Sequence, residues 1–360
     1  MGYSSAADQN TYNLTADIFH KNMTCLMWNE VNKKRYGTLM HLDAVSIAQL
    51  AINVAGVIGN TLIITLLRKH SLGGRLPTVF FRSQAVCDLL VNLESIFFGI
   101  DAEMWSVPIS WVNHLLCRLW HSQFIFWLSV QLSIGNLVLI GLERFLALSF
   151  PMTYQQLQPS RVAVYCLSGN LLYNLILASP NILETGLEND CCVSQHHVTS
   201  TGKILSAYSI VWFIMIYLLA FILLIIFYGG VIVALRQSAL LHRATTRSAA
   251  MMRFTRMAIV ITLVYVACIS YDAFAYLIGR TGLWTYQYNT IWHNLGMLFV
   301  SLNSFANPYI YYLFVLRDSC RRKFKLDGFK LRQTSNALPI SQQSHPSNYL
   351  RSKKCSSASQ

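Results

Sequence analysis

The sequence predicts an all-α fold, a bundle of seven membrane-spanning helices. Of the 360 residues, 54% are hydrophobic and only 12% are charged, whereas soluble proteins carry about 25% charged residues. A bilayer core about 30 Å thick is crossed by roughly 20 apolar residues of helix. Four runs of that length contain no Asp, Glu, Lys or Arg, and three more have few polar interruptions. The four are Ala44–Leu67, Leu119–Leu142, Val162–Leu183 and Ala207–Leu235, and the three are Ser83–Ile100, Met257–Gly279 and Trp284–Leu316.

The distribution of charge predicts the orientation in the membrane. With the N-terminus outside, the inner segments are about 68–82, 144–161, 236–256 and 317–360, and they hold 21 of the 28 Lys and Arg. An excess of Lys and Arg on the cytoplasmic side is the usual bias. We therefore expect a multi-pass plasma-membrane protein with its N-terminus extracellular. The net charge of +13 then indicates contact with anionic membrane lipid and gives no reason to expect nucleic-acid binding.

The chain divides into an outer tail (1–42), the helical domain (43–316) and a cytoplasmic end (317–360). Asn13 and Asn22 begin glycosylation sequons in the outer tail. Residues 317–326 predict a short amphipathic helix on the inner membrane face, with Cys320 as a candidate for palmitoylation. The residues after it are rich in Ser, Gln and Asn, which is typical of disorder.

Four of the nine cysteines fall on the outer side, where disulfides persist. They are Cys25, Cys117, Cys191 and Cys192. A bridge from Cys117 to Cys191 or Cys192 would tie the loop after the fourth span over the bundle. The sequence leaves open which of the two is used and whether Cys25 takes the other.

Asp88 is an ionisable residue inside a predicted span, where such residues are costly and usually face the bundle interior. Short polar side chains on other spans could be its partners: Asn60, Ser133, Asn303, Ser304 and Asn307. Two interpretations are open. These residues form a hydrogen-bonded network that stabilises helix packing, or they hold a small hard cation such as Na⁺ through Asp88 and Ser133.

The stretch "SLNSFANPYIYYLF" (301–314) predicts a weakened helix. Asn303, Asn307 and Tyr311 are spaced by four residues and share one helical face. Pro308 has no N–H, so the carbonyl of Ser304 loses its helical donor and needs a side chain or water in lipid. Such an element suits two alternative arrangements.

Five short motifs in order resemble the rhodopsin-like family of G-protein-coupled receptors over about residues 44–325. They are "GVIGN" (56–60), "AVCDLL" (85–90), "ERF" (143–145), "PMTY" (151–154) and "NPYIY" (307–311). The resemblance implies a receptor that binds an extracellular ligand and activates a heterotrimeric G protein. Arrestin and receptor kinases would be further partners. It implies no catalytic residue, so we do not expect an enzyme.

The resemblance also implies roles for individual residues. Glu143 and Arg144 would hold the resting state, and Arg144 would then meet the G protein with Tyr228 and Tyr311 as active-state neighbours. Asn307 and Pro308 would belong to the moving part of the last span. Cys117 would form the disulfide to the second outer loop. Asp88, Ser133, Asn303 and Asn307 would form a sodium and water site.

The sequence also departs from the family pattern. Asn170 stands where a tryptophan is usual, Ala220 where the fifth span has proline, and "CISYD" (268–272) where the sixth has Cys-Trp-x-Pro. The spacing from Cys117 to Arg144 is about two residues longer than usual. Met251 occupies the place of an acid that clamps the arginine in many members, which predicts raised basal signalling.

The ligand is predicted from the outer half of the bundle. Alignment from Ser133 and Arg144 puts Phe126 where amine receptors carry an aspartate, which disfavours biogenic amines, and Ser301 where opsins carry the retinal lysine. Aromatic and acidic candidates favour a neuropeptide bearing Arg or an amidated end. A small non-amine ligand, or a seven-span transporter or channel, are the alternatives. The candidate ligand-binding residues are Glu94, Asp101, Gln123, Phe126, Trp127, Gln131, Trp212, Asp272, Tyr276 and His293.

Overall fold

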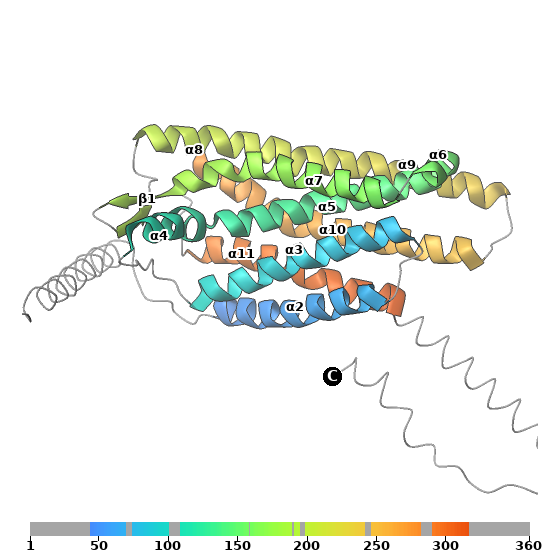
Figure 1. Ribbon diagram of the computed structural model, residues 1–360, viewed down its shortest axis with the longest axis horizontal. Helices are drawn as coiled ribbons and strands as arrows, with labels where there is room; N and C mark the ends of the chain where they lie inside the picture. The colour runs from blue at the N-terminus through green and yellow to red at the C-terminus, as the bar shows by residue number, and fades with distance from the viewer. Residues whose placement is uncertain are drawn as a thin grey trace, which may run out of the picture.

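The computed structural model describes eight segments of the chain: 44–69, 74–100, 109–157, 159–188, 191–194, 199–241, 246–281 and 290–316. They form a bundle of long helices that lie side by side and reverse direction at its two ends (Figure 1). We call the end that carries the β-hairpin the hairpin end, and the opposite one the α6 end. The predicted tail, Asn13, Asn22, Asp101 and the helix at 317–326 lie outside the described residues.

The long helices of the bundle match the predicted spans, with shifts at their ends. The last begins at Ile291 rather than Trp284. The helices are α2 (Ala44–Lys69), α3 (Arg75–Ile100), α5 (Phe124–Ser149), α7 (Pro159–Ala178), α8 (Thr199–Trp212), α9 (Leu219–Leu241), α10 (Thr246–Arg280) and α11 (Ile291–Tyr311). Shorter elements join or extend them: α4 (Ser110–Leu115), η1 (Leu116–His121), α6 (Pro151–Gln156), η2 (Ser179–Glu184), η3 (Phe213–Leu218) and η4 (Tyr312–Leu316).

Five helical segments within the described residues are long and apolar enough to cross a membrane. The helices α3 and α11 are not among them, although the sequence predicts a span in each. Both carry buried polar groups, such as Asp88 on α3 and Asn303 and Asn307 on α11, which lower their mean hydropathy. These side chains are buried within the bundle, which is where polar residues of membrane helices usually lie.

The third span absorbs its extra residues at the hairpin end. Leu116–His121 forms a π-helical turn, which holds more residues than an α-helical turn of the same height. Gln123 follows with φ of 56°, in the left-handed region that non-glycine residues rarely adopt, and α5 begins at Phe124. The long spacing from Cys117 to Arg144 is thereby accommodated before α5, so the residues of α5 keep regular α-helical spacing.

The missing prolines have different consequences in two helices. The fifth span contains a π-helical turn, η3, which ends two residues before Ala220, so a widened turn forms there without proline. The helix α10 is continuous through "CISYD". There the Ser270 hydroxyl donates to the carbonyl of Val266 and is 2.7 Å from the Tyr217 hydroxyl of η3. A Ser side chain that bonds back to the preceding turn tends to bend a helix, and the same hydroxyl joins α10 to η3.

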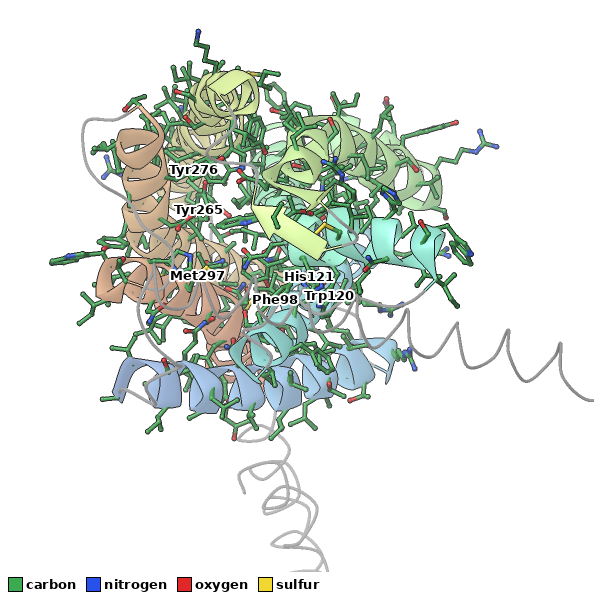
Figure 2. The ribbon with its side chains drawn as sticks, turned by 90° about the vertical axis from the view of Figure 1, so that its left-hand side faces the viewer. Phe98, Trp120, His121, Tyr265, Tyr276 and Met297 are labelled. Carbon is green, nitrogen blue, oxygen red and sulfur yellow. A yellow bond between two sulfur atoms is a disulfide. The ribbon has the colours of Figure 1, made fainter. Side chains whose placement is uncertain are left out.

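A two-stranded antiparallel hairpin covers part of the bundle at the hairpin end (Figure 2). The strand β1 (Thr185–Glu188) pairs with β2 (Cys191–Ser194), with Thr185 opposite Ser194. A disulfide joins Cys192 to Cys117, and the Thr185 hydroxyl donates to the Cys117 carbonyl at 2.6 Å. The structure therefore selects Cys192 over Cys191, the choice that the sequence leaves open.

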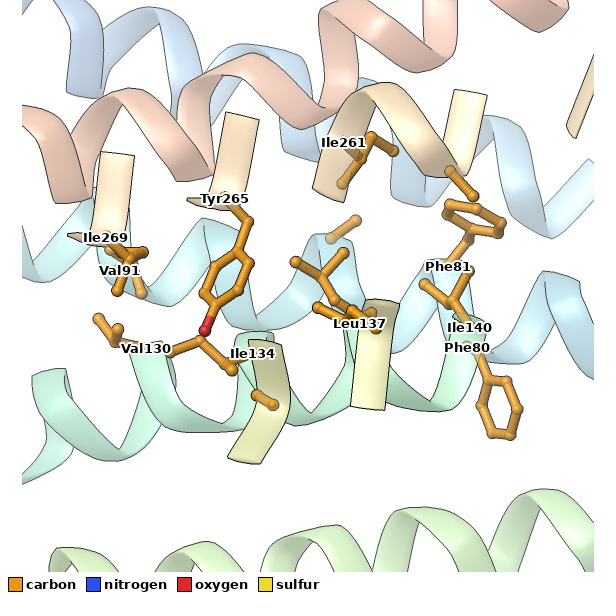
Figure 3. Packing of buried hydrophobic residues seen from close by; sticks show 14 of the residues in the cluster. Phe80, Phe81, Val91, Val130, Ile134, Leu137, Ile140, Ile261, Tyr265 and Ile269 are labelled. Carbon is orange, nitrogen blue, oxygen red and sulfur yellow. The ribbon is translucent and has the colours of Figure 1, made fainter. Parts of the chain in front are cut away.

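The apolar core lies between α3, α5 and α10 (Figure 3). Tyr265 of α10 is fully buried in it, with its hydroxyl directed towards Val130 and Ile134 of α5. This hydroxyl has no hydrogen-bond partner among the described residues. A buried polar group without a partner costs about 1–3 kcal/mol. The hydroxyl of Tyr265 therefore carries a local cost that its buried ring does not.

Tyr265→Phe is expected to stabilise the protein, because it removes only the unpaired hydroxyl. We expect the free energy of unfolding to rise by about 1 kcal/mol and the melting temperature of the purified protein by about 2–4 °C. Tyr217→Phe is the control and should lower the melting temperature, since its hydroxyl contacts Ser270. A loss in Tyr265→Phe equal to that in Tyr217→Phe would contradict this prediction.

Candidate functional site

The carboxylate of Asp88 is the centre of a fully buried polar cluster in the middle of the bundle. Ser133 of α5 donates to its Oδ1 at 2.8 Å, and Asn307 of α11 donates to its Oδ2 at 2.7 Å. The Gln84 amide, one turn earlier on α3, donates to both carboxylate oxygens. Three helices that are far apart in sequence are therefore joined through one buried acid.

The carbonyl that Pro308 deprives of its helical donor does have a partner. Asn60 of α2 donates its side-chain amide to the Ser304 carbonyl at 3.2 Å and to the Gly56 carbonyl at 3.0 Å. Asn60 is therefore the side-chain donor that the Ser304 carbonyl is predicted to need in lipid. Because this bond depends on one side chain of a neighbouring helix, α11 can exchange it if the two helices move. The roles implied for Asn307 and Pro308 remain predictions.

Asn303 is buried beside these residues on α11, but no hydrogen bond joins it to Asp88 within the described segments. Its Oδ1 and that of Asn307 have no donor there. Buried oxygens of this kind are suited to ordered water, which can donate to them.

A second polar ladder connects α3, α5 and α7. Asn136 of α5 donates to the Ser83 hydroxyl at 3.0 Å and accepts from Asn170 of α7 at 3.3 Å. Asn170 also bonds the Leu132 carbonyl, and a Cβ on Gly135 would overlap its amide. The resemblance places Asn170 where a tryptophan is usual. Here hydrogen bonds of Asn170, together with its close contact with Gly135, join α7 to α5 in place of an aromatic ring.

Arg144 lies at the α6 end of α5 and is paired with its neighbour Glu143. Both side chains are almost fully buried, and two nitrogens of Arg144 donate to the two oxygens of Glu143. The Tyr154 hydroxyl of α6 also donates to Glu143. Burial, followed by the charge of Glu143, raises the pKa of Tyr154, so its hydroxyl stays protonated and remains a donor at neutral pH. The carboxylate of Glu143 thus holds Arg144 from one side while Tyr154 holds the carboxylate.

The predicted neighbours of Arg144 are buried nearby but not bonded to it. The Tyr228 ring lies 3.6 Å from the position of a Cβ on Gly141, one turn before Arg144 on α5. No hydrogen bond joins Arg144 to Tyr228 or Tyr311 in the described part of the chain. The buried apolar residues Leu137 and Ile140, labelled in Figure 3, lie along α5 between Ser133 and Arg144. The resting-state and active-state roles implied for these residues remain predictions.

A continuous chain of aromatic rings crosses the bundle near the hairpin end. It starts at the short π-helical turn, passes through α3 and α5 to α8, and ends on α10. Ring centroids in successive pairs are 5.2–6.3 Å apart. This spacing is typical of favourable aromatic contacts. The rings belong to Trp120, Phe98, Phe126, Trp127, Trp212 and Tyr276, of which Figure 2 labels Trp120, Phe98 and Tyr276.

Polar side chains lie one helical turn below this aromatic chain, away from the hairpin end. On α5, Gln131 follows Trp127 by four residues, and on α10 Asp272 precedes Tyr276 by four, so each pair shares a helical face. Gln131 is fully buried, and neither of its amide atoms has a partner among the described residues. Asp272 is also buried, and its Oδ1 lies 3.2 Å from the position of a Cβ on Gly296 of α11. Its carboxylate therefore faces α11.

The other predicted ligand-binding residues are placed as follows. Glu94 is buried on α3 with one carboxylate oxygen unpartnered among the described residues. Glu94 and Asp272 lie on different helices, α3 and α10. His293 is buried one turn from Gly296 on α11. Gln123 forms the left-handed turn before α5, which gives it a structural role.

Several contributors to these sites have no role in the predictions from sequence, among them Gln84, Phe98 and Trp120. Gln84 lies four residues before Asp88, a spacing that places both on one helical face. Phe98 and Trp120 belong to the aromatic chain, but the sequence does not show that their two segments meet. Among the described residues there is no group of three His, Cys, Asp or Glu side chains that could hold a metal ion.

The fold and these buried sites define a polytopic helical membrane protein of the receptor class. A family model described as 7 transmembrane receptor (rhodopsin family) matches residues 59–311. The chain therefore belongs to the rhodopsin family of seven-transmembrane receptors, which is not an enzyme family. The family resemblance drawn from the sequence motifs is confirmed.

Three known proteins show what this chain is similar to. "Octopamine receptor 1" of Lymnaea stagnalis is 25% identical over 190 residues, which cover 52% of this chain and 29% of the relative. "Octopamine receptor Oamb" of Drosophila melanogaster is 29% identical over 143 residues, 39% of this chain and 21% of the relative. "Probable G-protein coupled receptor No9" of Amphibalanus amphitrite is 28% identical over 141 residues, 39% of this chain and 29% of the relative. The matches span less than a third of each relative, and they do not support the predicted peptide ligand.

Proposed function

We propose that this protein is a G-protein-coupled receptor of the plasma membrane whose extracellular ligand carries a positive charge. The hairpin end would face outside, in agreement with the predicted extracellular N-terminus. Membership of the receptor family supports an extracellular ligand and a heterotrimeric G protein as partners. The observation that carries the charge of the ligand is the carboxylate of Asp272, which is buried one helical turn from Tyr276 on α10.

The two layers near the hairpin end suit a cationic group. Aromatic faces such as Tyr276 and Trp212 attract cations. Below them Asp272 and Gln131 offer oxygen acceptors, of which the carboxylate makes the stronger, charge-assisted bond. An ammonium or guanidinium group would therefore pass the aromatic chain and meet Asp272. In this arrangement the ligand supplies the charge that a buried carboxylate otherwise lacks.

The nature of the ligand beyond its charge rests on two opposed observations. Phe126, where amine receptors carry an aspartate, is fully buried between Phe98 and Trp127, so an ammonium has no counter-ion on α5. This favours a peptide that carries Arg or an amidated end. The relatives named octopamine receptors favour a monoamine as the second candidate, and on this chain Asp272 would be its counter-ion.

A screen of peptides and monoamines, octopamine included, separates these candidates. The full chain would be expressed with a promiscuous G protein, and second-messenger output measured. We expect activation by a cationic peptide. Activation only by a monoamine would replace the peptide with the second candidate. Activation only by neutral or anionic ligands would contradict the proposed charge, and ion currents without G protein would revive the transporter or channel alternative.

Asp272→Asn is expected to lower the potency of a cationic agonist by roughly 10- to 100-fold, the range for losing a charge-assisted hydrogen bond. Asparagine keeps the size of the side chain and removes its charge. Glu94→Gln is the matched control: it makes the same change of charge at a buried acid of α3 and should have a smaller effect, because the proposed counter-ion is Asp272. Equal losses in both variants, or none in Asp272→Asn, would contradict the assignment of the counter-ion.

A further inference from the structure

The amide of Gln84 stands where a cation at Asp88 would be expected. Its Nε2 lies 3.3 Å from Asp88 Oδ1 and 3.2 Å from Oδ2, almost equidistant from the two carboxylate oxygens. It also donates to the Ser133 hydroxyl oxygen. One nitrogen thus contacts three oxygens, two of Asp88 on α3 and one of Ser133 on α5. Asp88 and Ser133 are the two residues expected to ligate Na⁺.

The acceptor positions of Asp88 are all used by protein donors. An ionised carboxylate offers about four lone-pair positions. Gln84 donates to both oxygens, Ser133 donates to Oδ1 and Asn307 donates to Oδ2. The Ser133 hydroxyl donates its hydrogen bond to Asp88 and accepts one from Gln84. A cation at Asp88 needs free lone pairs on the carboxylate, and these are directed at N–H and O–H groups; the oxygens of the cluster without a donor among the described residues belong to the amides of Gln84, Asn303 and Asn307.

The residues present therefore do not fit the sodium site that the family resemblance implies. We propose that the Gln84 amide replaces the cation at Asp88, so that this receptor joins α3, α5 and α11 without bound sodium. The partial positive charge of the amide N–H groups acts where the ion would act. Hydrogen bonds among groups of one chain also do not depend on the ionic composition outside the cell. This inference involves neither the ligand nor the G protein.

The opposite orientation of the amide defines the competing arrangement. Amide oxygen and nitrogen are assigned from the hydrogen-bond network. Turned by half a rotation, Gln84 would present Oε1 to the Asp88 carboxylate, and two acceptors face each other stably only with a cation between them. In that arrangement Gln84, Asp88 and Ser133 would be ligands, and sodium would stabilise the protein. The two arrangements therefore predict opposite responses to sodium.

The melting temperature of the purified full-length receptor in 150 mM NaCl and in 150 mM choline chloride, at equal ionic strength, decides between them. A ligand that binds only the folded state raises the melting temperature. For the wild-type chain we expect the two salts to give the same value within about 1 °C. A value higher in NaCl by about 2–4 °C, and abolished by Asp88→Asn, would overturn the proposal.

Gln84→Met removes the amide and keeps the length of the side chain. In choline chloride this variant should melt below the wild type, because Asp88 loses donors. In NaCl it should recover about 2–4 °C, because the acceptors are now free for an ion. Ser83→Ala is the matched control: Ser83 adjoins Gln84 on α3 but bonds Asn136, so any loss should be equal in both salts. Absence of the NaCl effect in Gln84→Met would overturn the role given to the amide. If that variant does not fold, Gln84→Leu and the wild-type comparison provide the same test.

Discussion

Glu143→Gln is expected to raise ligand-independent signalling about ten-fold. Glutamine keeps the size of the side chain but loses the charge that holds Arg144 through two hydrogen bonds. Charge-assisted bonds contribute about 1.5–3 kcal/mol, and 1.4 kcal/mol shifts a two-state equilibrium ten-fold. Second-messenger output without ligand, normalised to receptor at the cell surface, measures the effect. Basal output equal to that of the wild type would contradict the resting role of this pair.

Tyr154→Phe should act in the same direction with a smaller effect, about two- to ten-fold, since it removes one bond from a neutral donor to Glu143. Tyr165→Phe is the matched control, because Tyr165 is 72% exposed on α7 and removal of its hydroxyl should leave basal output unchanged. If the control rises as much as Tyr154→Phe, the effect does not come from the contact with Glu143.

Arg144→Ala tests the output of the same site. We expect it to abolish G-protein activation at normal surface expression, because the group that meets the G protein in related receptors is gone. Signalling that remains intact would show that the family mechanism does not apply to this chain. The wild type itself is expected to signal above empty cells, since Met251 replaces a clamping acid.

Cys192→Ala is expected to remove most of the receptor from the cell surface, whereas Cys191→Ala should not. The bond between Cys117 and Cys192 closes a loop across 75 positions of sequence, and loss of such a disulfide typically costs about 2–4 kcal/mol. It also releases the hairpin from the end of the bundle. Surface labelling, together with the melting temperature of purified protein, measures both effects.

Cys191 provides a matched control for the Cys192→Ala substitution. Cys191 and Cys192 are adjacent on β2, so both substitutions change the same loop and the same kind of side chain. Cys117→Ala should behave like Cys192→Ala, and the double variant should be no worse than either single one. The reverse pattern, with loss in Cys191→Ala and normal expression of Cys192→Ala, would contradict the observed pairing.

The sequence identifies several members of each site but not how they are joined. Asp88, Ser133 and Asn307 follow from the rule that polar groups in lipid face one another, and the structure brings these three together. Gln84 completes the cluster, but a glutamine on a helix gives no sign by itself of pointing at a carboxylate. Near the hairpin end the sequence gives the acids and aromatics, whereas their order across four helices requires the packing.

The sequence alone determined the helical membrane fold, the receptor family and the need for a partner at the Ser304 carbonyl. Each follows from local properties: the length of apolar runs, motif spacing and the missing N–H of proline. Only the tertiary structure decided that Asn60 is that partner, that Cys192 pairs with Cys117 and that Gln84 completes the Asp88 cluster. Each of these depends on which residues meet across helices, and contacts between distant segments are fixed by packing rather than by any pattern within one segment.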